Sequence, residues 1–354
     1  MSGRLLIYGA SGYTGRLLAA RACRRGLNAV LAGRTRSRLE AVAQATALPY
    51  RVFGLEDPTK LDAALFDVEV VLNAAGPFAA TARPVVEACL RTGKHYLDVS
   101  GELPTFQRLH GYDEPARAAG VMVMPGVGFV VAASDCLAAH VAACMPQARY
   151  LRLALSRTGL VSRGSYTTML GLVREGVSIR REGRLCAVPV GKLERGFDYG
   201  EGERVSTAVS WADVFTAYHT TGIAHIEVYM EADTWTRWLY ELAACFAEPL
   251  RLTPLQKLLE LQARAWPEGP SEGRRAAAPR VIVAEAEDRF RRRARALLHT
   301  PDGYSFTPLS ALAIAERVLA GDFRAGFQTP AGVYGADFVL VLEGVRREDV
   351  TRTY

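Results

Sequence analysis

Near the N-terminus, a run of three glycines joins a short apolar segment to an amphipathic one, and this feature most constrains the fold. Residues 4–8 read Arg-Leu-Leu-Ile-Tyr, which is typical of a buried parallel strand. Residues 14–25 carry apolar side chains at helical spacing. The glycine turn between them spans residues 9–15 and reads GASGYTG. A strand that enters a helix through such a turn predicts a parallel sheet covered by helices.

The same alternation of strand and helix continues to about residue 128. Further strands are expected at residues 28–32, 50–53, 68–73, 95–99 and 121–124, and further helices at residues 38–46, 60–65, 84–92 and 112–119. Short connections between them predict an α/β domain over residues 1–128, a Rossmann fold with a doubly wound parallel sheet.

The pattern changes after about residue 148. Apolar and polar residues alternate in four segments, at residues 151–156, 185–189, 205–209 and 223–230. This alternation is typical of a mixed or antiparallel sheet with one covered face. We therefore expect a second, α+β domain over residues 129–302.

The glycine turn has the position of a dinucleotide-binding fingerprint, with the spacing GxxGxxG in place of GxGxxG. Gly9 permits the tight turn, Gly12 lets the backbone approach a pyrophosphate, and Gly15 lets helix and strand pack closely. Backbone N–H groups at the start of the helix would face the phosphates. The candidate pyrophosphate-binding residues are Gly9, Ala10, Ser11, Gly12, Tyr13, Thr14 and Gly15.

The end of the second strand indicates which nucleotide binds. An NAD-binding site usually has Asp or Glu here for the ribose 2′-hydroxyl, whereas this chain has Arg34 and Thr35, followed by further basic residues. Arginine binds a phosphate through two charge-assisted hydrogen bonds. We therefore predict NADP(H) as the cofactor; the alternative is a solvated basic turn without a ligand.

The nicotinamide would lie beyond the fourth and fifth strands, because ligands of open parallel sheets bind at the carboxyl ends of the strands. Small residues after the fourth strand let the cofactor pass close to the backbone. In the fifth strand, alternation places Tyr96, Asp98 and Ser100 on one face. The candidate residues on this side are Ala75, Gly76, Pro77, Ser100 and Gly101.

A proton donor is less evident from the sequence. None of the four lysines has a tyrosine four residues before it, so the YxxxK mechanism of short-chain dehydrogenases is excluded. His219 is a candidate acid because a histidine pKa lies near neutrality, and Tyr166 is another; either could instead be structural. Asp98 is a third candidate, with an orienting role as the alternative. No metal site is expected, because the cysteines lack zinc-site spacing and the histidine pair His219 and His225 lacks a matching carboxylate.

Composition limits the partners. The net charge of +6 is modest, and the densest basic run, at residues 289–295, is expected in a solvated hairpin, so no nucleic-acid partner is predicted. No run reaches the roughly 18 apolar residues that span a bilayer, and we expect a cytoplasmic location without a transmembrane segment. Aromatic residues in the helical region 235–264 could face a core, a membrane or a partner subunit.

These motifs resemble a known family. The segments GASGYTG, AGRTRSRL, NAAGPF, ACLRTGKHYLDVSGE and TTGIAHIEVY are similar to those of saccharopine dehydrogenase-like oxidoreductases, which include the trans-acting enoyl reductases. The resemblance implies an NADP(H)-dependent enzyme that reduces a C=C (enoyl) or C=N bond of a small or lipid-like substrate. It also implies that the second domain, residues 129–302, binds the substrate and forms a homodimer interface. A C-terminal segment, about residues 303–336, is expected to return to the first domain. The alternatives are a non-catalytic NADP(H)-binding sensor and a lipid-associated interaction protein.

Overall fold

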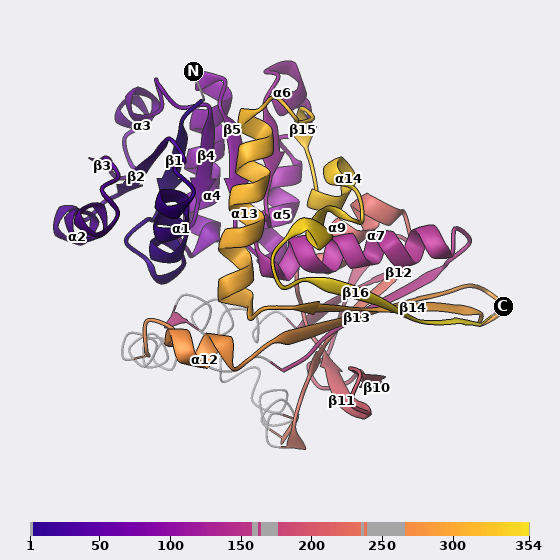
Figure 1. The fold of residues 1–354 in the computed structure, drawn as a ribbon. Coiled ribbons are helices and arrows are strands. Elements are labelled where there is room, and N and C mark those ends of the chain that lie inside the picture. The colour runs from indigo at the N-terminus through magenta and orange to yellow at the C-terminus, as the bar shows by residue number, and fades with distance from the viewer. Residues whose placement is uncertain (1–2, 158–161, 164–175, 235–236, 239–265, 354) are drawn as a thin grey trace, which may run out of the picture. The chain divides into compact units, whose positions relative to one another are not determined.

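The computed structural model describes residues 3–157, 162–163, 176–234, 237–238 and 266–353. The chain forms two compact units, and each combines segments that are distant in the sequence (Figure 1). Unit 1 comprises residues 1–132 and 303–335, and unit 2 comprises residues 133–302 and 336–354. The sequence pattern predicts the first boundary slightly earlier, between residues 128 and 129.

Unit 1 is built on a seven-stranded sheet in which every neighbouring pair is parallel. The strand order is β15-β6-β5-β4-β1-β2-β3. The strands are β1 (Leu5–Tyr8), β2 (Ala29–Gly33), β3 (Tyr50–Val52), β4 (Val70–Asn73), β5 (His95–Asp98), β6 (Met122–Met124) and β15 (Gly326–Phe327). The six strands expected from the sequence are present, and the predicted doubly wound Rossmann fold is confirmed.

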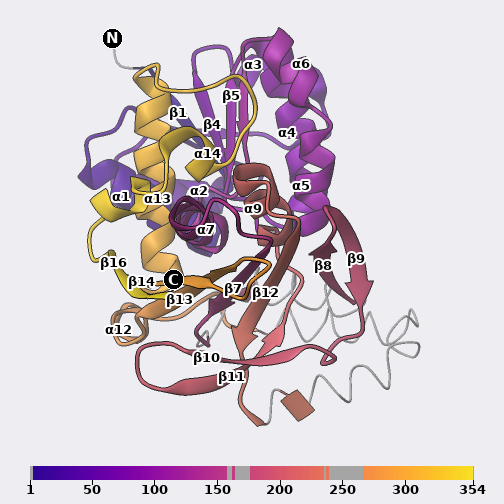
Figure 2. The same ribbon diagram turned by 90° about the vertical axis from the view of Figure 1, so that its right-hand side faces the viewer.

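Helices cover both faces of this sheet, as right-handed crossovers require. Helices α1, α2 and α13 form one layer and α3, α4 and α5 the other (Figure 2). The helices of unit 1 are α1 (Tyr13–Arg24), α2 (Arg36–Thr46), α3 (Pro58–Ala64), α4 (Phe78–Thr92), α5 (Leu103–His110), α6 (Asp113–Ala118), α13 (Gly303–Leu319) and α14 (Pro330–Tyr334). Helix α5 was not predicted from the sequence pattern.

Helix α13 begins earlier than the sequence pattern indicated. The sequence of residues 308–319 predicts a helix with Thr307 as its N-cap, but the helix starts at Gly303. The Thr307 hydroxyl donates to the Gly303 carbonyl at 2.7 Å and accepts from the Phe129 N–H at 3.2 Å. Its side chain therefore bonds within the first turn instead of capping it. Helix α13 packs against α1, β4 and β5, and so completes the core of unit 1.

Unit 2 is built on a mixed sheet. Its main path is β10-β11-β12-β7-β13-β14-β16, and β8 joins β12 and β9 beside it. The pair β12–β7 is parallel and the other pairs are antiparallel. The strands are β7 (Tyr150–Leu155), β8 (Val177–Arg181), β9 (Arg184–Val188), β10 (Glu194–Asp198), β11 (Glu203–Ala208), β12 (His225–Glu231), β13 (Arg280–Glu287), β14 (Arg293–Thr300) and β16 (Arg346–Thr353).

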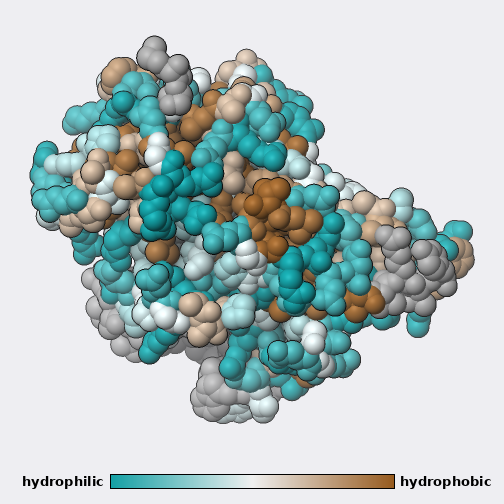
Figure 3. Space-filling view, viewed as in Figure 1, coloured by the Kyte–Doolittle hydropathy of each residue, from teal (hydrophilic) through white to brown (hydrophobic). Residues whose placement is uncertain are grey.

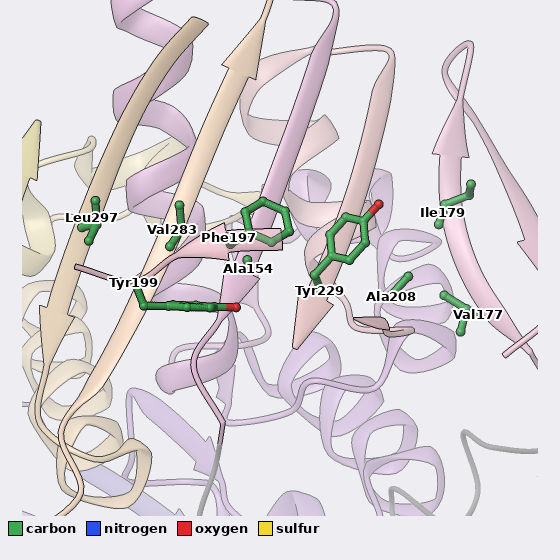
Figure 4. Packing of buried hydrophobic residues seen from close by; sticks show 9 residues of the cluster. All are labelled: Ala154, Val177, Ile179, Phe197, Tyr199, Ala208, Tyr229, Val283 and Leu297. Atoms are coloured by element: carbon green, nitrogen blue, oxygen red, sulfur yellow. The ribbon is translucent and has the colours of Figure 1, made fainter. Parts of the chain in front are cut away.

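Helices cover one face of this sheet, and an apolar cluster lies on the other. Helices α7 (Ser134–Cys144) and α9 (Asp213–Thr221) pack together against the first face (Figure 2). On the second face, Phe197 and Tyr199 pack beside Tyr229 and the aliphatic residues of neighbouring strands (Figure 4). The short helices α12 (Glu272–Ala276), η1 (Phe129–Ala133) and η3 (Phe338–Val341) complete the described elements.

The basic run of residues 289–295 lies where the sequence placed it, in the turn of the β13–β14 hairpin and the start of β14. The Asp288 carboxylate accepts from the backbone of Phe290 and from the Arg292 guanidinium, at 2.8 and 2.7 Å. The hairpin turn therefore neutralises part of its own charge.

The surface on the side shown in Figure 3 is mostly hydrophilic, interrupted by a compact hydrophobic group. Among the residues that the structure describes, no helix is both long and apolar enough to cross a bilayer. Most of the aromatic helical region 235–264 lies outside the described residues; Trp238 is described and is exposed.

Candidate functional site

The strand order of unit 1 reverses between β1 and β4. The chain moves outward through β2 and β3, returns to β4 beside β1, and then proceeds to the other side. In open α/β sheets, ligands bind at the carboxyl ends of the strands that flank such a point. A Cβ atom on Gly9, which follows β1, would lie 2.7 Å from the backbone nitrogen of Ala75, which follows β4. The two candidate cofactor-binding loops therefore meet at the switch point.

The glycine turn requires glycine at its two ends. Gly9 has a φ of +81°, which side-chain-bearing residues rarely adopt, and its N–H donates to the Ala32 carbonyl at 2.9 Å. A Cβ on Gly15 would lie 2.1 Å from the Gly9 carbonyl oxygen. Gly12 is exposed, and a Cβ there would lie 3.3 Å from the same oxygen. The turn thus holds its shape through Gly9 and Gly15 and presents the backbone of Gly12 to solvent.

The N-terminus of α1 suits an anion. Gly12 is its N-cap, no side chain caps the helix, and its first turn contains no acidic residue. The Arg16 guanidinium donates to the Ser11 carbonyl at 3.0 Å, which places a positive charge beside the turn. The helix dipole and the N–H groups of the first turn favour a phosphate at this position. Arg16 was not among the binding residues predicted from the sequence.

The N-terminus of α4, which follows Pro77, is closed by a carboxylate. Glu102 accepts from the N–H groups of Phe78 and Ala79 at 3.1 and 3.0 Å, and from the Thr105 hydroxyl at 3.1 Å. A negative group already occupies this helix end, so of the two helices beside the switch point, α1 is the one that suits a diphosphate.

Arg34 and Thr35 lie exposed between β2 and α2. Thr35 is the N-cap of α2 but makes no side-chain capping hydrogen bond. Arg36 pairs with Glu40 at 3.6 Å, whereas Arg34 makes no side-chain hydrogen bond or ion pair in the part of the chain described. Burial raises the pKa of Tyr8 at the end of β1 to about 12, and the nearby Arg34 charge opposes this rise. The donors of Arg34 are therefore available to a phosphate near the ends of β1 and β2.

Asp98 ends β5 and is completely buried. Its carboxylate accepts from the Tyr96 hydroxyl at 2.7 Å and from the N–H groups of Ser100 and Gly126, both at 2.9 Å. Burial raises the pKa of Asp98 to about 6, although these three donors oppose the rise. Every carboxylate oxygen has a protein donor, so the contacts favour the orienting role for Asp98 over proton transfer to a substrate.

Ser100 and Gly101 follow β5. The Ser100 side chain is buried, and its hydroxyl oxygen accepts from the Glu102 N–H at 3.1 Å. A Cβ on Gly101 would lie 3.1 Å from the Val130 side chain. The Ser100 hydroxyl is therefore bonded within its own loop, and Gly101 lies close to a neighbouring side chain.

The other candidate proton donors belong to unit 2. His219 lies in the last turn of α9 and is exposed. Its sequence context predicts a position before a strand, and it does precede β12, on the helix that ends at Thr221. Tyr166 lies outside the described residues. Among the residues described, no group of three or more His, Cys, Asp or Glu side chains could hold a metal ion.

Comparison with known proteins supports the nucleotide site. Residues 5–124 match the family model of the saccharopine dehydrogenase NADP binding domain. A saccharopine dehydrogenase-like oxidoreductase from Homo sapiens is 30% identical over 146 residues, which are 35% of this chain and 34% of that protein. A trans-acting enoyl reductase from Mycobacterium ulcerans is 31% identical over 139 residues, which are 37% of this chain and 33% of that protein. The match spans about a third of the length of these relatives.

A solved structure extends the likeness in fold beyond the matched segment. Apo saccharopine dehydrogenase (L-Glu forming) from Saccharomyces cerevisiae aligns with a TM-score of 0.67 and 13% identity, over 99% of this chain and 100% of that chain. At this identity the likeness concerns the fold. The family match and the geometry at the ends of β1, β2 and β4 agree with the motifs in the sequence: residues 5–124 of this chain are similar to the saccharopine dehydrogenase NADP binding domain.

Proposed function

We propose that this protein is an NADP(H)-dependent oxidoreductase that reduces a C=C (enoyl) or C=N bond of a small or lipid-like substrate. One observation carries the proposal: an uncapped helix N-terminus behind a glycine turn and an unpaired Arg34 lie at the same edge of the unit 1 sheet. The helix terminus suits a diphosphate, and the guanidinium suits an additional phosphate on the ribose.

In this proposal each part of the site has a distinct task. The turn from Gly9 to Gly15 holds the pyrophosphate, and Arg34 with Thr35 binds the 2′-phosphate. The backbone of residues 75–77 and 100–101 lines the nicotinamide. The cofactor supplies the hydride when bound, and the protein must orient the substrate, deliver a proton and exclude water. His219 and Tyr166 remain the candidate proton donors, and a homodimer in the cytoplasm remains the predicted form.

Calorimetric titration of an Arg34→Ala variant tests the cofactor assignment. We expect NADPH binding to weaken at least tenfold, about 1.4 kcal/mol, while NADH binding barely changes. Arg91→Ala is the matched control, because Arg91 lies exposed in the last turn of α4, away from the carboxyl ends of the strands, and pairs with Asp62. Equal losses for both nucleotides would contradict the assignment to the 2′-phosphate.

Turnover distinguishes an enzyme from a nucleotide sensor. The full chain would be incubated with NADPH and a panel of α,β-unsaturated acyl thioesters and imines, and NADPH absorbance followed. Consumption that depends on one class of substrate supports the oxidoreductase. Stoichiometric binding without consumption across the panel would instead favour the non-catalytic binding role.

A further inference from the structure

Five buried polar side chains of unit 1 form one continuous hydrogen-bonded network at the carboxyl ends of β4, β5 and β6. They are Asn73, Tyr96, Asp98, Ser100 and Glu102, each at most 8% exposed. We call them the β4–β6 network. Buried polar groups cost free energy unless they are paired, so a fully bonded network of this size fixes the segments that it joins.

The network first fixes the loop after β4. The Asn73 side-chain oxygen accepts from the Ala75 N–H at 3.0 Å, and its amide nitrogen donates to the Thr81 hydroxyl at 3.1 Å. The Thr81 hydroxyl in turn donates to the Ala75 carbonyl at 2.6 Å. Both backbone groups of Ala75 are therefore bound by side chains, directly beside the point where Gly9 approaches.

The network next joins β4 to the loops after β5 and β6. The Asn73 amide also donates to the Tyr96 hydroxyl at 3.4 Å, and this hydroxyl donates to Asp98 at 2.7 Å. Asp98 binds the N–H groups of Ser100 and Gly126, one in each loop. The Tyr96 hydroxyl is thus the link between the two halves of the network.

The network finally returns to the loop after β4. Ser100 accepts from the Glu102 N–H at 3.1 Å, and the Glu102 carboxylate accepts from the N–H groups of Phe78 and Ala79. The loop of residues 74–77 is therefore held at both ends, by Asn73 before it and by Glu102 after it.

We propose that the β4–β6 network positions the loops that receive the nicotinamide half of the cofactor, without any of its five side chains acting on the hydride itself. This inference rests on the proposed function. Among the described residues, the adenosine side of the site shows no comparable network: Arg34 is exposed and unpaired, and the Gly9–Gly12 turn is held by backbone hydrogen bonds and by the Arg16 guanidinium on the Ser11 carbonyl. A defect in the network should therefore weaken binding of the nicotinamide half and spare the adenosine half.

A Tyr96→Phe variant tests this, because it removes only the linking hydroxyl and preserves the ring. Binding of NADPH and of 2′,5′-ADP, which lacks the nicotinamide, would be measured by calorimetry. We expect the Kd for NADPH to rise at least fivefold and the Kd for 2′,5′-ADP to change less than twofold. The fluorescence of bound NADPH should also change, since it reports the surroundings of the nicotinamide.

Tyr112→Phe is the matched control. It removes a tyrosine hydroxyl that donates to a carboxylate in the same unit, to Glu87 at 2.9 Å, but outside the network. We expect both ligands to bind it as they bind the wild type.

Glu102→Gln gives a second, independent variant in case Tyr96→Phe fails to fold, and thermal unfolding checks both. Phe78 and Ala79 donate to different carboxylate oxygens, and glutamine replaces one of these oxygens with an NH2 group that cannot accept, so the same selective loss of NADPH binding is expected. Unchanged NADPH binding in the folded variants, or equal losses for both ligands, would overturn this inference but not the proposed function. Failure of the wild type to bind either ligand would overturn the proposed function and the inference with it.

Discussion

At the scale of single residues, the three glycines of the first turn have separable physical roles. Gly15 is required by packing, because a Cβ there would overlap the Gly9 carbonyl oxygen and lie 2.7 Å from the Ala10 Cα. Gly12 has an ordinary extended backbone, with φ −73° and ψ 168°, and its surroundings would nearly accommodate a side chain. A ligand that approaches the backbone explains glycine at position 12 more readily than packing within the fold does.

Alanine substitution separates these roles. Gly15→Ala should destabilise unit 1 by roughly 1–3 kcal/mol, because backbone atoms would have to move. Gly12→Ala should leave stability nearly unchanged but weaken NADPH binding at least tenfold. Thermal unfolding and calorimetric titration measure the two effects, and Gly273→Ala, at an open helical position, serves as a control. A Gly12→Ala protein that binds NADPH normally would argue against a pyrophosphate at this turn.

At the scale of elements, the helix pair α7 and α9 of unit 2 contains a buried acid. Asp213 begins α9, and one carboxylate oxygen accepts from the Ser134 hydroxyl of α7. Its other oxygen has no partner among the described residues, and neither has the nearby Thr216 hydroxyl. Burial raises the pKa of Asp213 to about 7, the Ser134 hydrogen bond opposes the rise, and the charge of Asp135 adds to it.

This arrangement predicts that stability falls as pH rises. The unfolded chain ionises Asp213 near its ordinary pKa of 3.8, whereas the folded chain keeps it neutral until about pH 7. Its stabilising contribution is therefore complete below pH 3.8 and lost as pH rises to 7, by roughly 4 kcal/mol in total. Asp98 acts in the same direction up to about pH 6.

An Asp213→Asn variant should show a flatter decline in the free energy of unfolding between pH 4 and 7, measured by denaturant titration. Asp57→Asn is the control, because Asp57 is exposed and its pKa is lowered, mainly by the Lys60 N–H. If the free energy of unfolding fell as steeply with pH in Asp213→Asn as in the wild type, the Asp213 carboxyl would not be the source of this decline.

The elements also show what could be predicted from the sequence. The strands β1 to β6 were predictable because each is a local apolar run between turn residues. Strand β15 has only two residues and is defined by its pairing with β6, so it carries no local signal. The glycine turn and Arg34 were found through their place after a strand. The role of Glu102 could not be found in this way, because its carboxylate bonds to the backbone of residues 78 and 79, on a different element.

At the scale of the whole molecule, neither unit is a continuous stretch of chain. The family match ends at residue 124, yet unit 1 also contains residues 303–335. Helix α13 from this segment buries Phe306, Leu312 and Ile314 completely, or nearly so, in the core of unit 1. Each such side chain contributes roughly 1.5–3 kcal/mol, and three of them approach the entire stability of an ordinary domain.

Truncated chains therefore test whether the motif residues can bind the cofactor without residues 303–335. A chain that ends at residue 302 retains every candidate cofactor-binding residue but exposes the face of unit 1 that α13 covers, so we expect it to aggregate and to bind no NADPH. A chain that ends at residue 335 keeps unit 1 complete and loses η3 and β16, which belong to unit 2, so NADPH binding should persist. Soluble yield, circular dichroism and NADPH titration compare the two. If the shorter chain bound NADPH as tightly as the longer one, residues 303–335 would be dispensable for the site, and the nucleotide domain would coincide with its family motif.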